Sequence, residues 1–161
     1  MPRKLPGPMI DGLMAVAEQL AQASGSMGVR QASIRRGVSS AYYALFHALC
    51  TLCADELVGW SKKGSLPPIY RSLDHGPVSK KLRSREARLI DPAIETIGAL
   101  FQNLQENRHA ADYAPPSALF SRTEALALID EARDAITLIE GLDAKARLDL
   151  AILLLARPRA G

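Results

Sequence analysis

Apolar residues along this chain recur at the three- and four-residue spacing of amphipathic helices, and no segment alternates in the manner of a strand. The pattern predicts a first helix over about Met9–Ala23 and a long second helix over about Val29–Val58. A third helix is predicted over about Asp91–Tyr113, with Pro92 at its first position, where the missing N–H costs nothing. The fold class predicted from this spacing is all-α.

The fourth predicted helix has sequence signals at both of its ends. Ser121 and Glu124, in SRTE, form a capping box, in which each side chain bonds to the backbone N–H of the other residue. Gly141 is expected to end this helix. Its expected buried face carries Ala125, Ile129, Ala132, Ile136 and Ile139.

The fifth predicted helix is apolar on nearly every side. It begins after Asp143 and ends before Pro158. A stripe of Leu148, Ile152 and Leu155 is broadened by Leu150, Leu153 and Leu154. A helix of this kind is expected to have two neighbours, and one of them could belong to a second subunit.

The second predicted helix has two different faces. At about 100° per residue, one arc forms a core stripe of Ile34, Val38, Ala41, Leu45, Leu49 and Leu52. The opposite arc is polar and aromatic, with Arg36, Ser40, Tyr43 and His47. These four side chains could contact phosphate and base. The alternatives are a face that is amphipathic without a ligand, or the seam of a dimer.

The third predicted helix places charge on its own buried side. Its apolar stripe consists of Ile94, Ile97, Phe101 and Leu104. Steps of four residues continue this stripe to Arg108 and Asp112, while His109 and Tyr113 lie together on a neighbouring flank. Because an unpaired buried charge is costly, Arg108 is expected to pair with Asp112. The pair could form a binding site or act only as a structural bridge.

Charge is distributed unevenly along the 161 residues, which are expected to form a single domain over 1–161. Residues 60–89 contain eight Lys or Arg and two Asp or Glu, a net charge of +6, so the rest of the chain carries −3 within a total of +3. A basic segment of this kind can bind an anionic partner, with His75, Lys80 and Lys81 as candidate contacts. The alternative is a solvated connector with one short helix.

The remaining motifs argue against several classes of site. Cys50 and Cys53 form a C-x-x-C deep inside a predicted helix, where core packing is expected rather than redox chemistry. His47, His75 and His109 lack metal-ligand spacing, and no glycine-rich phosphate loop occurs, so neither a metal nor a cofactor is predicted. With no secretory signal and no membrane-length apolar run, a soluble cytoplasmic protein without membrane contact is expected.

Two segments resemble a known family. RRGVSSAYYALFHAL, over 35–49, and NRHAADY, over 107–113, are similar to the AYYA-x-FHA and R-x-x-ADY motifs of a small bacterial branch of the HEPN (higher eukaryotes and prokaryotes nucleotide-binding) domains. The resemblance covers about Gln19–Leu142. It implies an antiparallel bundle of four to five helices, a homodimer, and binding of RNA or a nucleotide in a toxin–antitoxin or defence system.

The same resemblance implies either of two roles. Active members look like metal-independent endoribonucleases, with an arginine, a polar residue and a histidine four to six positions after the arginine. Arg108 and His109 match the first two and are the catalytic candidates, but Asp112, Tyr113 and Ala114 occupy the positions where the histidine is expected. The motif is therefore degenerate, so the standard ribonuclease mechanism is not expected. Binding without cleavage and cleavage with His47 or His75 supplied from elsewhere in the fold are both left open. The alternative is a non-catalytic protein-interaction subunit that pairs with a nucleotidyltransferase or an antitoxin.

Overall fold

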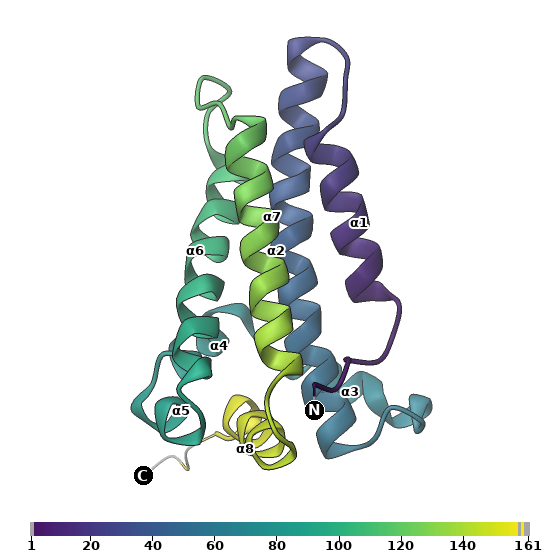
Figure 1. The fold of residues 1–161 in the computed structure, drawn as a ribbon, viewed down its shortest axis with the longest axis vertical. Coiled ribbons are helices and arrows are strands. Elements are labelled where there is room, and N and C mark those ends of the chain that lie inside the picture. Colours follow the sequence, from purple (N-terminus) through teal and green to yellow (C-terminus); the bar gives the residue numbers. More distant parts are fainter. Residues whose placement is uncertain (1, 158, 160–161) are drawn as a thin grey trace. The chain divides into compact units, whose positions relative to one another are not determined.

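The computed structural model describes residues 2–157 and 159, and every regular element in them is helical (Figure 1). Five helices lie close to the predicted bounds: α1 (Met9–Ala21), α2 (Met27–Leu57), α6 (Ala93–Tyr113), α7 (Arg122–Glu140) and α8 (Ala144–Leu155). The all-α prediction is thereby confirmed. Met1, Pro158, Ala160 and Gly161, which the single-domain prediction includes, lie outside the described residues.

The basic segment 60–89 is folded rather than a solvated connector with one short helix. It forms a 3-10 helix, η1 (Lys63–Ser65), and the short helices α3 (Leu66–Tyr70), α4 (His75–Leu82) and α5 (Arg85–Ile90). Apolar side chains from this segment are buried, namely Leu66, Leu73, Val78, Leu82 and Ala87. The net charge of residues 60–89 did not indicate this packing, because the basic residues lie between the apolar residues that determine the fold.

The chain divides into two compact units. Unit 1 consists of residues 1–7, 48–99 and 137–161, and unit 2 consists of residues 8–47 and 100–136. Three helices, α2, α6 and α7, contribute residues to both units.

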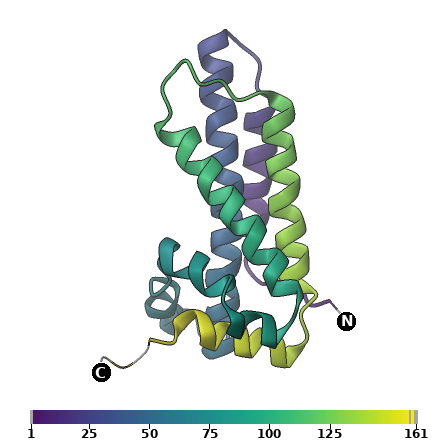
Figure 2. The ribbon, with the colours of Figure 1, turned by 90° about the vertical axis from the view of Figure 1, so that its left-hand side faces the viewer.

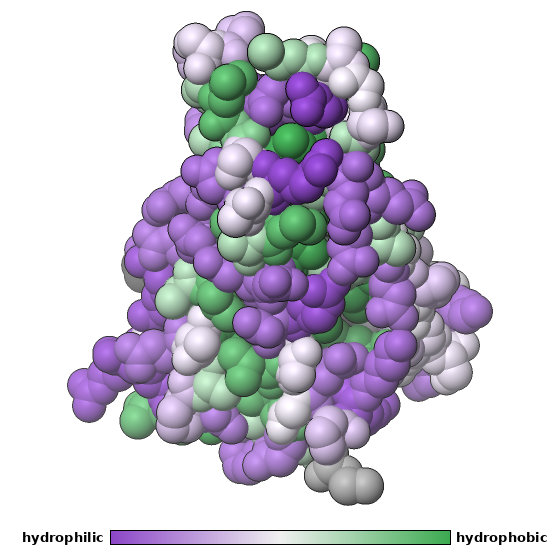
Figure 3. Space-filling model, turned by 45° about the horizontal axis from the view of Figure 1, so that its top comes forward, coloured by the Kyte–Doolittle hydropathy of each residue, from purple (hydrophilic) through white to green (hydrophobic). Residues whose placement is uncertain are grey.

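Unit 2 is an antiparallel bundle of four helical segments. In Figures 1 and 2, α1 and the parts of α2, α6 and α7 in this unit lie side by side with alternating directions. The predicted stripes face its interior, where Ile34, Val38, Leu45, Phe101, Leu104 and Ile129 are buried. Gly37 allows α1 and α2 to approach closely, since a Cβ on it would lie 3.0 Å from the Ala17 carbonyl oxygen. At the end of this bundle where the α1–α2 and α6–α7 loops lie, Figure 3 shows apolar residues as separate patches among polar ones.

Unit 1 contains the short helices and α8. Both α4 and α5 pack against α8. The buried face of α8 consists of Ala146, Arg147, Leu150, Ala151 and Leu154. Leu148 and Ile152, from the stripe that the spacing first suggests, are instead exposed. Because α8 is apolar on most sides, its sequence could not indicate which side faces the core.

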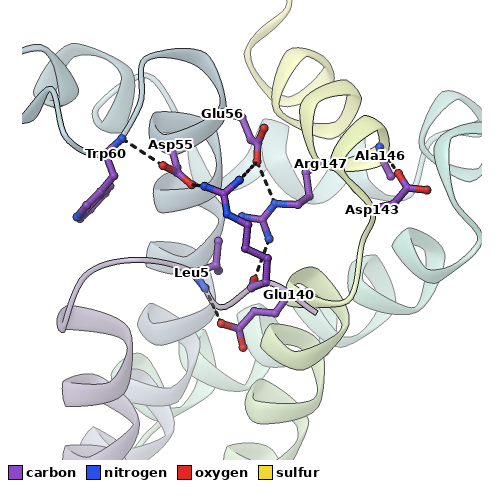
Figure 4. Close-up of polar contacts among 9 residues, drawn as sticks. Leu5, Asp55, Glu56, Trp60, Glu140, Asp143, Ala146 and Arg147 are labelled. Carbon is purple, nitrogen blue, oxygen red and sulfur yellow. Dashed lines mark hydrogen bonds and ion pairs between the residues drawn. The ribbon is translucent and has the colours of Figure 1, made fainter. Parts of the chain in front are cut away.

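A buried arginine joins the N-terminal segment to two helices of unit 1 (Figure 4). Arg147, only 1% exposed, donates from Nε to Glu56 at 2.9 Å and from Nη1 to the Arg3 carbonyl at 3.1 Å. Arg3 in turn pairs with Asp55 at 3.0 Å. Glu140 accepts the backbone N–H of Leu5 at 2.6 Å. The segment before α1 is therefore held by charge-assisted hydrogen bonds, which are stronger than neutral ones.

Side-chain caps close the N-terminal ends of α7 and α8. The backbone N–H of Ser121 donates to the Glu124 carboxylate at 2.7 Å, and the Glu124 N–H donates to the Ser121 hydroxyl at 3.0 Å, which confirms the capping box. Asp143 caps α8 by accepting the Ala146 N–H at 2.8 Å.

The C-x-x-C pair belongs to the core, as predicted. Cys50 and Cys53 are free and buried. Burial raises the pKa of each thiol to about 12, so both remain protonated at neutral pH. A protonated thiol is a poor nucleophile and a poor metal ligand, and this agrees with a packing role.

One helix in the described part of the chain, α2, is long and apolar enough to cross a membrane by composition alone. In its most apolar stretch of 18 residues, 78% is buried inside the protein. The core helix of a soluble protein has the same properties, so this feature is weak support for a membrane span.

Candidate functional site

Arg108 lies on the last two turns of α6, against the aromatic side chains of α2. Its guanidinium carbon lies 5.1 Å from the centroid of the Tyr42 ring and 5.8 Å from that of Tyr43. The side chain is 16% exposed, and its buried Nε has no hydrogen-bond partner. Positive charge over an aromatic face is stabilising, more so when water is excluded. The guanidinium of Arg108 therefore packs against α2 rather than extending into solvent.

Asp112 gathers polar groups from both helices. Its Oδ2 lies 3.5 Å from Nη1 of Arg108, which confirms the predicted pair one turn apart. Its Oδ1 accepts a short hydrogen bond from the hydroxyl of buried Ser39 and lies 4.0 Å from Nη1 of Arg36. The carboxylate thus joins α6 to α2 and partly neutralises two arginines.

Arg35, which sequence reasoning did not select as a site residue, lies in the same part of unit 2. Its guanidinium donates to four backbone carbonyls at the end of α6 and just beyond it, those of Ala111, Ala114, Pro115 and Ala118, at 2.6 to 3.2 Å. These carbonyls lack helical partners, and a cation at a helix C-terminus also interacts favourably with the helix dipole. Arg35 therefore fixes the turn that follows Tyr113. Its position directly before Arg36 is the only sequence signal that could have indicated it.

A hollow of about 210 Å³ adjoins the cluster of Arg35, Arg36, Arg108 and Asp112, hereafter the arginine cluster. Ala32, Arg35, Arg36, Ala111 and Asp112 line it. The Arg36 side chain is 75% exposed, which makes it the most accessible cation of the cluster. With three guanidinium groups and one carboxylate, the arginine cluster carries excess positive charge and is suited to an anion.

His109 and Tyr113 form an exposed aromatic pair on the last turns of α6. Their ring centroids are 4.9 Å apart, and Tyr113 is 69% exposed. The two side chains lie together, as the four-residue spacing predicted. They offer a ring surface beside Asp112 in the sequence, on which a planar ligand could stack.

The remaining candidates on α2 are less accessible than predicted. Tyr43 is half-buried, because its ring covers Arg108 and contacts the fully buried Tyr42 ring at 5.4 Å. His47 is also half-buried, and burial lowers its pKa. A neutral imidazole at neutral pH is a weak contact for phosphate. The polar face of α2 is therefore mostly occupied by packing, and Arg36 is its exposed member.

The candidates of the basic segment belong to unit 1. Lys81 donates to the carbonyls of Leu154 and Ala156 at 2.9 and 2.7 Å, and so caps the end of α8. Lys80 is exposed, and His75 is the half-buried first residue of α4. Capping uses the charge of Lys81 inside the protein, so Lys81 is a weaker candidate for an anion than Lys80.

Sequence reasoning also missed Ser39 and Tyr42 as site residues. Tyr42 lies between the two faces of α2 by its helical angle, and it is fully buried. Its ring nevertheless contacts Arg108, and Ser39 bonds to Asp112. Ser39 lies outside the core stripe of α2, and nothing in its helical position indicated a partner on α6.

Within residues 2–157 and 159, no group of three or more His, Cys, Asp or Glu side chains is placed so that it could hold a metal ion. Comparisons with models of protein families, with curated proteins and with solved structures each return no match.

Proposed function

We propose that the chain is a HEPN-like module that binds RNA or a nucleotide through the arginine cluster, in a toxin–antitoxin or defence system. The observation that carries the proposal is the exposed Arg36 guanidinium beside the hollow of about 210 Å³. Phosphate is the natural ligand of such a guanidinium, because arginine donates two parallel hydrogen bonds to it. His109 and Tyr113 would supply ring contacts to a base.

Contacts between the two motifs support the HEPN-like part of the proposal. The motif of α2 supplies Ser39, Tyr42 and Tyr43, and the motif of α6 supplies Arg108 and Asp112. These side chains contact one another although the contacting residues lie 65 to 73 positions apart in the sequence. Residues that define a family motif would be expected to converge in this way.

Binding is favoured over cleavage for two reasons. Arg108 is turned toward Tyr42, Tyr43 and Asp112, so it is already compensated before any phosphate arrives. No histidine follows Arg108 at the positions that the ribonuclease motif requires. Activating the ribose hydroxyl requires a general base, and a tyrosine phenol is poorly suited to that role.

Replacing Arg36 by alanine is expected to weaken binding of a single-stranded RNA oligonucleotide about tenfold at low salt, the effect of removing one charge-assisted hydrogen bond. The slope of log K against log salt concentration should also become shallower by roughly 0.7, because the variant neutralises one phosphate fewer. Fluorescence anisotropy at several salt concentrations measures both quantities.

Arg133→Ala is the matched control, because Arg133 lies in the same unit, is half-exposed, and pairs with Glu18 and Asp130 away from the arginine cluster. It changes the net charge by the same amount and should leave affinity nearly unchanged. No binding at low salt, or an equal loss of affinity in both variants, would refute the proposal.

A second candidate function is a non-catalytic protein-interaction subunit, which the exposed apolar residues of α8 favour. Leu148 and Ile152 lie one turn apart on this helix and are 40% and 49% exposed. Apolar side chains in adjacent turns of a surface helix are typical of a helix that packs against a partner.

The partner proposed for the Leu148/Ile152 face is a second copy of the chain. Sedimentation velocity at micromolar concentration should show a dimer, and Leu148→Gln with Ile152→Gln should convert it to a monomer. Val16→Gln, at an apolar residue of α1 with similar exposure, should not do so. A wild-type monomer over this range would argue against the homodimer and leave this face without a function.

A further inference from the structure

Unit 1 contains a second cavity, of about 290 Å³, that has no role in the function proposed above. It is lined by Trp60, Lys63, Leu66, Pro67, Tyr70 and Arg71. Of the two aromatic residues, Trp60 precedes α3 and Tyr70 is its last residue, so the apolar side chains of α3 lie between them in the sequence. Lys63 and Arg71 are exposed, and no carboxylate belongs to the lining.

The Trp60 ring is held in place from the side of the N-terminal segment. The backbone N–H of Trp60 donates to Asp55 at 3.1 Å. Figure 4 shows the indole turned away from the charged residues around Arg147. Gly7 lies against the six-membered part of the indole, so a Cβ there would be 2.7 Å from Cζ2 of Trp60. Gly7 also has a φ of +91°, which favours glycine. The ring is thereby positioned before any ligand binds.

Tyr70 contributes a neutral ring to the cavity. Burial raises its pKa to about 12, with a smaller contribution from Cys50, while a hydrogen bond with Thr51 opposes the rise. The hydroxyl therefore stays protonated at neutral pH. The only charges in the lining are those of Lys63 and Arg71.

Two rings and two cations around one cavity specify a ligand of defined chemistry. Aromatic side chains bind flat unsaturated rings by stacking, and this tolerates any base because every base has a π-face. Lysine and arginine bind phosphate by charge-assisted hydrogen bonds. We propose that this cavity binds a single nucleotide, with its base against Trp60 and Tyr70 and its phosphate at Lys63 and Arg71.

The composition of the lining also predicts selectivity. No Asn, Gln, Asp or Glu side chain is present there to read the edge of a base. Purine should therefore be preferred over pyrimidine through stacking area, without further discrimination among bases. The site depends on residues of unit 1 alone, so it does not rest on the arginine cluster.

Trp60 is the sole tryptophan of the chain, which makes intrinsic fluorescence a reporter of this cavity alone. Titration with adenosine monophosphate should quench the emission saturably, adenosine should bind more weakly, and inorganic phosphate alone should cause no quenching. A short single-stranded oligoadenylate serves as a second arm. Tighter binding of the oligonucleotide would identify a strand as the source of the nucleotide, and equal or weaker binding would identify the free mononucleotide.

Lys63→Gln combined with Arg71→Gln should raise the dissociation constant for adenosine monophosphate about a hundredfold, because two charge-assisted hydrogen bonds to the phosphate are lost, each worth about tenfold. Lys62→Gln is the matched control, since Lys62 is exposed, adjacent and outside the lining, and it should have no effect. Arg36→Ala should also have no effect, which separates this site from the arginine cluster. Absence of saturable quenching would overturn the proposal. So would equal affinity for adenosine and adenosine monophosphate together with an unchanged dissociation constant in the Lys63/Arg71 variant.

Discussion

Replacing Arg147 by methionine is expected to lower the free energy of unfolding by about 3–5 kcal/mol, the cost of breaking a buried ion pair by removing one partner. The variant leaves Glu56, whose side chain is 14% exposed, with only the weaker 3.8 Å contact to Arg3. It also leaves the Arg3 carbonyl without the hydrogen bond from Nη1. Urea denaturation followed by circular dichroism measures the change.

A double variant separates the cost of the unpaired carboxylate from the loss of packing. Arg147→Met with Glu56→Gln should be more stable than Arg147→Met alone, because no unpaired charge then remains beside the methionine. Arg85→Met, at an exposed position of α5, is the control for net charge and should stay within about 0.5 kcal/mol of the wild type. A destabilisation by Arg147→Met no greater than that of the control would show that the buried cluster does not stabilise the fold.

Replacing Asp112 by asparagine is expected to have opposite effects on stability and on binding. Stability should fall by about 1–3 kcal/mol, because Arg108 would lose its carboxylate while its buried Nε already lacks a partner. RNA binding should tighten, since the only negative charge of the arginine cluster is removed from the lining of its hollow. Chemical denaturation and fluorescence anisotropy on the same variant test both effects.

Ser39→Ala provides the matched comparison. It removes the hydroxyl that donates to Asp112 but leaves the carboxylate charged, so it should destabilise without tightening RNA binding. If Asp112→Asn instead weakened RNA binding, the carboxylate would be needed to organise the ligand site. The electrostatic account of the hollow would then be wrong.

Local signals placed the helix ends well. The capping box of Ser121 and Glu124 was predicted and is present, and Asp143, after which the fifth helix was expected to begin, caps α8. They could be read from the sequence because each involves residues three positions apart, within one helical turn. The pairing of Arg108 with Asp112 is of the same kind, since helical geometry alone brings residues four apart onto one face.

Contacts between distant segments could not be read in this way. The bond between Ser39 and Asp112 and the four carbonyl contacts of Arg35 join segments more than 70 residues apart. Periodicity indicates which side of a helix is buried but not which residues of another helix it meets. For this reason Arg108 and Asp112 were found from the sequence, whereas Arg35 and Ser39 were not.

Helical spacing and caps were sufficient to specify an all-α chain, the positions of its five long helices and the charged end of α6, because these features arise from contacts within a few residues. The inward side of α8, the folding of residues 60–89 and the burial of Arg147 depended on tertiary packing. In α8, leucines surround most of the helix, so only the neighbours α4 and α5 determine which of them is buried. Arg147 could be buried because Glu56 and the Arg3 carbonyl, far away in the sequence, compensate its charge and accept from its Nε and Nη1.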